Sequence, residues 1–198
     1  MQGVPNRMTY SEGPRLIKYN NMQIFTVGHG TRSIEELIEL LKTYKIERIV
    51  DVRTIPRSRY NPQFNKDILR ESLKKAHIGY IHIKGLGGLR HAKKNSVNAA
   101  WQNASFRGFA DYMQTEDFKK NIERLIKLAK QKKIAIMCAE SVPWRCHRSL
   151  IADALQVRDI TVKHIMSKKT CKDHELTPWI KICGLQITYP LAKTVLEG

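Results

Sequence analysis

The stretch KIAIMCAESVPWRCHRSLIADALQVRDITVKHIM, residues 133–166, contains a complete strand–helix–strand unit. Its apolar run over 133–139 predicts a buried strand, and 160–166 predicts a second one. Between them, residues 144–157 carry apolar side chains at the spacing of a helix with 3.6 residues per turn. Two strands joined through a helix pair in parallel with a right-handed crossover. The stretch therefore predicts an α/β fold.

The same alternation recurs upstream. Apolar runs predict strands over 23–28, 47–53 and 79–84, and helical patterns follow over 33–41, 65–76, 106–112 and 115–129. Repeated strand–helix units favour a three-layer, Rossmann-like α/β domain with a mostly parallel sheet of about five strands. We expect this domain to span 22–167, after a flexible N-terminal arm (1–21) and before a C-terminal extension (168–198) that packs on it.

Composition narrows the class of protein. The 198 residues are 42% hydrophobic, and no apolar run is long enough for a membrane helix or a secretory signal. Four cysteines in a chain of this size do not resemble a disulfide scaffold, which favours the cytoplasm. The 35 Lys and Arg against 18 Asp and Glu give a formal charge of +17. This charge predicts nucleic acid or another phosphate-bearing ligand as the partner, although a basic surface without a ligand is the alternative.

In open parallel sheets, ligands bind beyond the carboxyl ends of the strands. His29 follows the first predicted strand, and Arg53 ends the second beside Asp51. We expect His29 to take part in catalysis and Arg53 to bind an anion, although Asp51 is also explained as a buried carboxylate held by Arg53. Further anion or nucleic-acid contacts are expected from the following loop, which carries Arg57, Arg59 and Tyr60.

The turn from Cys138 to Arg148 carries the densest set of reactive side chains. The start of a helix attracts anions, and Arg145 and Arg148 add two guanidinium groups, so we expect an anion site here. The same surroundings lower the pKa of a thiol. The order Cys138 to Arg145 is similar to the loop of cysteine phosphatases, but the six intervening residues are one too many, and the loop lacks their glycines.

Glu140 and His147 are the preferred catalytic pair, because a carboxylate and an imidazole exchange protons near neutral pH. Cys138 and Cys146 are expected to be structural or reactive thiols. A metal site built from Cys146, His147, His29 and Glu140 lacks any known ligand spacing, so we predict no metal. The sequence leaves the cofactor open.

Several motifs together resemble domain-of-unknown-function family 488 over residues 24–166. The resemblance implies a Rossmann-like domain with a cleft lined by these motifs, and it names no activity. The family's usual first motif has Ser where this chain has Gly30. The matching motifs are Thr26-Val-Gly-His-Gly-Thr-Arg32, Val50-Asp-Val-Arg53 with Pro56-Arg-Ser58, Asn61-Pro-Gln-Phe64, Leu86-Gly-Gly88, Phe106-Arg-Gly-Phe-Ala-Asp-Tyr-Met113 and Met137-Cys-Ala-Glu140 through Pro143-Trp-Arg-Cys-His-Arg148.

These observations favour an enzyme that cleaves a glycosidic or phosphodiester bond in nucleic acid or a nucleotide, as in repair. The first alternative is a non-catalytic module that binds nucleic acid or nucleotides with the same basic edge. The second is a small-molecule hydrolase or transferase whose charge is incidental. Salt-dependent binding separates the first two hypotheses from the third.

Overall fold

The computed structural model describes Tyr19 and residues 22–191, and these residues form an α/β fold around one main sheet. Within them, the sheet has six strands in the order β3-β2-β4-β1-β5-β6, of which the first five are parallel and β6 is antiparallel. The Rossmann-like prediction is confirmed, and the additional strand β6 comes from residues beyond 167. The strands are β1 (Gln23–Gly28), β2 (Arg48–Asp51), β3 (Gly79–His82), β4 (Ile134–Cys138), β5 (Thr161–Ile165) and β6 (Cys171–Asp173).

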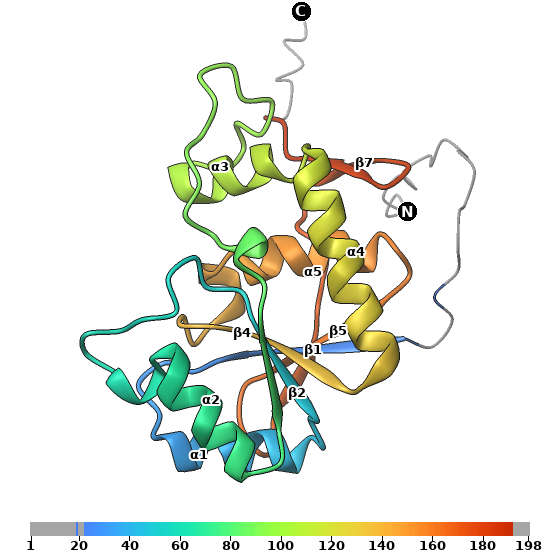
Figure 1. Cartoon of the computed structure of the whole chain (residues 1–198). Helices are drawn as coiled ribbons and strands as arrows, with labels where there is room; N and C mark the ends of the chain where they lie inside the picture. The colour runs from blue at the N-terminus through green and yellow to red at the C-terminus, as the bar shows by residue number, and fades with distance from the viewer. Residues whose placement is uncertain (1–18, 20–21, 192–198) are drawn as a thin grey trace, which may run out of the picture.

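Helices cover both faces of the sheet (Figure 1). On one face, α1 (Ile34–Thr43) and α2 (Lys66–Lys75) pack their apolar side chains into one core cluster. On the other face, α4 (Glu116–Gln131) and α5 (Arg148–Gln156) build a second cluster, with α3 (Ala104–Tyr112) beside them. The strand order runs one way from β1 to β3 and the other way from β4 to β5. The switch point, where a ligand site is expected, therefore lies between the carboxyl ends of β1 and β4.

Most predicted helices and strands match the structure to within a few residues. Ser33 forms a capping box with Glu36 at the start of α1, and the Thr115 side chain caps α4. The helix predicted over 144–157 instead begins at Arg148. Pro143–Arg145 forms a separate 3-10 turn (η3), and Cys146 is extended, with φ −136° and ψ 142°. That extended residue ends the turn before α5 begins, which explains the difference.

The chain after β6 packs back on the helical layer above α5. Its hairpin, β7 (Lys181–Cys183) with β8 (Gln186–Thr188), leads to Tyr189, which is fully buried. The Tyr189 carbonyl accepts from the Ala100 N–H, so the end of the described chain supports the irregular segment 83–103. The expected N-terminal arm lies outside the described residues apart from Tyr19, as do residues 192–198. None of the helices described is both long and apolar enough to cross a membrane.

Candidate functional site

A pocket of about 430 Å³ opens at the switch point of the sheet. We call it the thiol pocket. Its walls come from the ends of β1, β2 and β4, from the turn before α5, and from the segment between β3 and α3. Eight of the predicted site residues line it, whereas Arg59, Tyr60 and Arg148 do not. The lining residues are His29, Arg53, Thr54, Ile55, Arg57, Ser58, Gly88, Leu89, Ser105, Phe106, Cys138, Ala139, Glu140, Arg145, Cys146 and His147.

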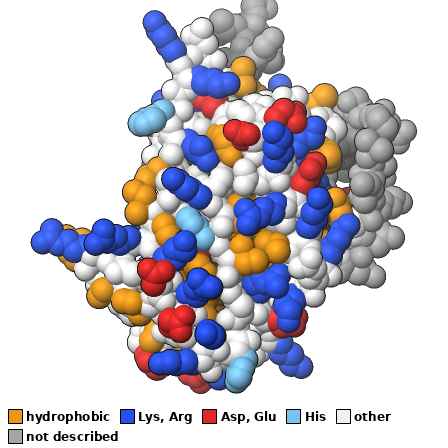
Figure 2. All heavy atoms as spheres, in the orientation of Figure 1, with side chains coloured by type: hydrophobic (Ala, Val, Ile, Leu, Met, Phe, Trp, Pro, Cys, Tyr) orange, Lys and Arg blue, Asp and Glu red, His pale blue; other side chains and the backbone are white. Residues whose placement is uncertain are grey.

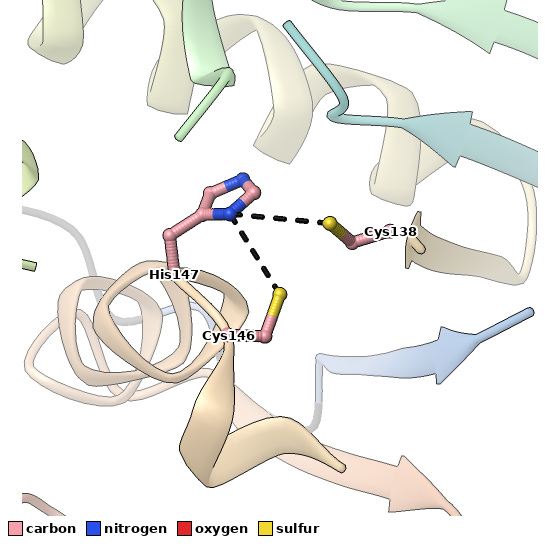
Figure 3. Close-up of side chains that lie close together, drawn as sticks. All are labelled: Cys138, Cys146 and His147. Carbon is pink, nitrogen blue, oxygen red and sulfur yellow. Dashed lines mark hydrogen bonds between the residues drawn. The ribbon is translucent and has the colours of Figure 1, made fainter. Parts of the chain in front are cut away.

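Two thiols converge on the His147 ring in this pocket (Figure 3). Cys138 ends β4, and its Sγ lies 4.0 Å from His147 Nδ1, while Cys146 Sγ lies 3.7 Å from the same nitrogen. The other ring nitrogen, Nε2, donates to the Val52 carbonyl at 3.2 Å. Both ring nitrogens thus face protein atoms. This arrangement makes His147 a partner of the thiols rather than a free base for water.

A glycine is required against the other side of the His147 ring. A Cβ at Gly88 would lie 2.4 Å from His147 Nδ1, closer than any real side chain approaches. Gly88 therefore allows the ring to lie between β2 and the segment that follows β3. Gly88 is explained by this contact within the protein, without a ligand.

The two thiols share one proton unequally. The neighbouring Cys138 thiol is the largest cause lowering the pKa of Cys146 far below that of a free thiol, and His147 and Arg148 lower it further. Conversely, the neighbouring Cys146 sulfur and burial raise the pKa of Cys138. Cys146 is only 4% exposed, so this stabilisation acts in a weakly screened environment. The pair therefore holds its proton on Cys138 and leaves Cys146 as a thiolate, the nucleophilic form of cysteine.

Arg148 is buried behind the turn, holds it through hydrogen bonds, and is not among the residues that line the pocket. It is 1% exposed, and its Nε donates to Cys146 Sγ at 3.4 Å. Its terminal nitrogens donate to the Glu140 carbonyl and to Thr26 Oγ1. The guanidinium group that was expected to bind an external anion thus lies against the internal anion, the Cys146 thiolate.

A buried line of hydrogen bonds continues from Thr26 into the C-terminal extension. Thr26 Oγ1 lies 2.7 Å from His164 Nδ1, His164 Nε2 lies 3.0 Å from His174 Nδ1, and His174 Nε2 lies 2.9 Å from Asp153 Oδ1. With both imidazoles neutral, each ring donates from Nε2 and accepts at Nδ1, and the Asp153 carboxylate accepts at the end of the line. Burial is the main cause lowering the pKa of His164 to about 3, in keeping with a neutral ring. The line connects the contacts of Arg148 to residues well after α5.

A second buried group fixes the opposite wall. The Asp51 carboxylate is fully buried and accepts from Arg53 N, Nε and a terminal nitrogen, and from the Tyr80 hydroxyl at 2.8 Å. Another Arg53 nitrogen lies 3.4 Å from His29 Nε2, and His29 Nδ1–H donates to the Gly30 carbonyl. Burial is the main cause lowering the pKa of His29 to about 4, so its ring is neutral at pH 7. Asp51 is therefore a buried carboxylate paired with Arg53, as the alternative explanation of its place in the sequence predicts. His29 packs beside the Arg53 guanidinium group.

The rim of the pocket carries both signs of charge. Arg57 and Arg145 are exposed and line it, as does Glu140, whose Oε1 accepts from the Val142 N–H at 3.4 Å. Tyr60 is 89% exposed and lies with Arg59 outside the lining. Two arginines and one carboxylate therefore lie at the rim of this pocket.

Cys138, Cys146 and His147 could also hold a metal, because their donor atoms all lie within 4.8 Å of one another. Two sulfurs and one imidazole suit a soft divalent ion such as zinc, with the pocket facing a fourth position. Glu140 and His29, which the sequence suggests together with Cys146 and His147, are not in this donor group. The sulfur of Cys138 takes their place.

Sequence reasoning missed the wall formed by Leu89, Ser105 and Phe106 and the buried line that ends at Asp153. The wall depends on Asp111, whose carboxylate accepts from Lys93 N, Ser96 Oγ and Asn98 Nδ2 and so shapes an irregular segment. A signal for the buried line does exist, since Asp153 interrupts the apolar row of α5.

Comparison with known proteins gives one match. Residues 33–155 match the model of the family described as Domain of unknown function DUF488, in agreement with the resemblance seen in the motifs. No curated protein and no solved structure matches the chain. The matched range includes both thiols and His147 but ends before His164 and His174.

Proposed function

The chain belongs to the DUF488 family, and from that premise and the geometry of the thiol pocket we propose that it is an enzyme that cleaves phosphodiester bonds in nucleic acid or nucleotides, with the Cys146 thiolate as its nucleophile. One observation carries the proposal: Cys146 lines the pocket, and its Sγ lies 3.7 Å from His147 Nδ1 and 3.4 Å from Arg148 Nε. A thiolate held by two nitrogen groups at the wall of an open pocket is typical of cysteine nucleophiles.

The side chains of the pocket suit a two-step displacement. In the first step, Arg57 and Arg145 hold the phosphate, the Cys146 sulfur attacks phosphorus, and a P–S bond forms as the P–O bond to the leaving group breaks. The departing oxygen takes the proton that Cys138 holds. In the second step, Glu140 accepts a proton from a water that attacks phosphorus. The P–S bond then breaks, Cys146 returns as a thiolate, and the proton on Glu140 replaces the one lost by Cys138.

The charge of the molecule supports the substrate class. Lys and Arg side chains are spread over the face drawn in Figure 2, and the chain carries a formal charge of +17. Such a field draws a polyanion to the surface irrespective of its sequence, with a strong dependence on salt. Arginines at the pocket rim favour the phosphodiester over the glycosidic bond as the group attacked, because they are placed to bind phosphate.

The test is cleavage of labelled single-stranded DNA, duplex DNA and RNA by the wild type and by Cys146→Ser at low salt. We expect Cys146→Ser to abolish cleavage and to retain binding. Cys183→Ser is the matched control, since Cys183 is exposed on β7 outside the pocket, and it should cleave normally.

Four results would overturn the proposal. Full cleavage by Cys146→Ser would remove the nucleophile. Salt-dependent binding with no cleavage of any phosphodiester would favour the non-catalytic module, and binding insensitive to salt would favour a small-molecule enzyme. Elemental analysis is run on the same preparation, and one zinc per chain, with thiols that react only after chelation, would replace the thiolate mechanism by a metal site.

A further inference from the structure

All three tryptophans of the chain line one second pocket, of about 420 Å³, which we call the tryptophan pocket. Trp144 is 58% exposed and Trp179 is 45% exposed, which is unusual for the largest aromatic side chain. Lys172 and Glu175 also line the pocket. Large aromatic groups that gather in an open hollow mark a binding surface.

The third tryptophan, Trp101, forms the inner wall. Its ring meets Trp179 edge-on, with centroids 5.4 Å apart, and lies 4.8 Å from Phe106, which lines the thiol pocket. Its indole Nε1 is buried and has no hydrogen-bond partner among the described residues. A buried N–H without an acceptor costs free energy.

One turn separates the two pockets. Trp144 and Arg145 are consecutive residues of η3, and Trp144 lines the tryptophan pocket while Arg145 lines the thiol pocket. A chain whose phosphate rests at Arg145 therefore reaches Trp144 within about one nucleotide. This arrangement alternates a cation for the backbone with an aromatic surface for the base, as single-strand binding sites do.

We propose that the tryptophan pocket holds an unstacked base of single-stranded nucleic acid whose phosphate lies at the thiol pocket. The inference rests on the substrate class proposed above and adds the single-stranded form. The pocket depends on Trp179, Lys172 and Glu175, which lie after the matched range 33–155, so it belongs to the part of the chain that the family match does not cover.

An aromatic cage for a methylated ammonium group is the other ligand chemistry that tryptophans suit. It is disfavoured by the charge of +17, which repels cations. Of the two carboxylates in the lining, Asp173 is already paired with Lys163 at 2.8 Å. Glu175 would therefore have to balance the charge of a bound cation alone.

The experiment uses the full chain carrying Cys146→Ser, so that binding is measured without cleavage. Because each tryptophan lines this pocket, quenching of intrinsic fluorescence by oligothymidylate reports on it directly. We expect quenching, and we expect Trp144→Ala and Trp179→Ala each to weaken binding of labelled oligothymidylate by roughly tenfold, with duplex binding unchanged. Trp144→Phe should restore most of the affinity, since it keeps an aromatic face. Leu185→Ala, at a 46% exposed position in the β7–β8 turn, is the control and should bind normally.

Unchanged oligothymidylate affinity in both alanine variants would overturn the inference, as would quenching by tetramethylammonium that oligothymidylate does not displace. The two proposals fail separately. If no substrate is cleaved but the tryptophan variants lose single-strand binding, the proposed cleavage activity is refuted and the proposed base site is supported. If cleavage requires Cys146 but the tryptophan variants bind and cleave normally, the base site is refuted and the cleavage activity is supported.

Discussion

Replacing Cys138 by alanine removes the neighbouring thiol, which is the largest cause of the lowered pKa of Cys146. A hydrogen bond to a charged group contributes about 1.5–3 kcal/mol. Since one pKa unit corresponds to about 1.4 kcal/mol, the pKa of Cys146 should rise by about 1 to 2 units in Cys138→Ala. His147 and Arg148 remain in place, so it should stay below 9.0, the ordinary value of a thiol.

The assay is the ultraviolet absorbance of the thiolate followed against pH, which detects buried thiols as well as exposed ones. Cys171→Ser and Cys183→Ser form the background, and the same protein with Cys146→Ser supplies the baseline. We expect a full thiolate signal in the parent protein well below pH 7 and an upward shift of the midpoint in Cys138→Ala. Cys138→Ser is the matched variant, because its hydroxyl still donates, and it should shift less. A parent midpoint near 9, or identical curves in all variants, would refute the shared-proton interpretation.

Three further predictions concern stability and geometry. The pKa values of His29 and His164 are lowered to about 4 and about 3 in the folded chain, so near pH 6.5 these histidines take up protons only when the chain unfolds. The free energy of unfolding should therefore fall by about 1.4 kcal/mol per pH unit per histidine as the pH drops from 6.5 towards 4. Urea unfolding at pH 7 and pH 5 measures this loss, and equal stability at the two values would contradict it. Asp153→Ala leaves the donors of His174, Thr177 and Tyr189 without their acceptor and should destabilise the protein by about 3 kcal/mol in the same assay, whereas a loss under about 1 kcal/mol would show that the buried line is dispensable. Gly88→Ala should displace the His147 ring and raise the pKa of Cys146 in the absorbance titration, and an unchanged midpoint would show that the ring position does not matter.

The sequence was sufficient to predict the parallel sheet because its strands are continuous apolar runs. Strands such as β1 and β4 are buried on both faces, so their pattern depends little on the rest of the chain. The sequence also predicted that His29, Arg53 and the turn at 138–147 lie close together, because parallel strands end at one edge of the sheet. These predictions needed topology alone.

The roles of individual side chains could not be predicted in the same way. Arg148 begins a helix and is charged, which favours an exposed anion contact, yet packing against Thr26 and Cys146 buries it. The link between His164 and His174 forms only because β6 returns beside β5, which no local pattern indicates. Packing likewise turns both His147 nitrogens toward protein atoms, whereas the pattern of residue types favours Glu140 and His147 over the cysteines.

The thiolate nucleophile at Cys146 is tested most directly by letting the four cysteines compete for a limiting amount of iodoacetamide at slightly acid pH. The modified positions are mapped by peptide mass spectrometry. We predict that Cys146 is alkylated first although it is nearly buried, because its lowered pKa keeps it a thiolate there, and that oligothymidylate protects it. If the exposed Cys183 reacts first and Cys146 is modified only after unfolding, the thiolate nucleophile is contradicted.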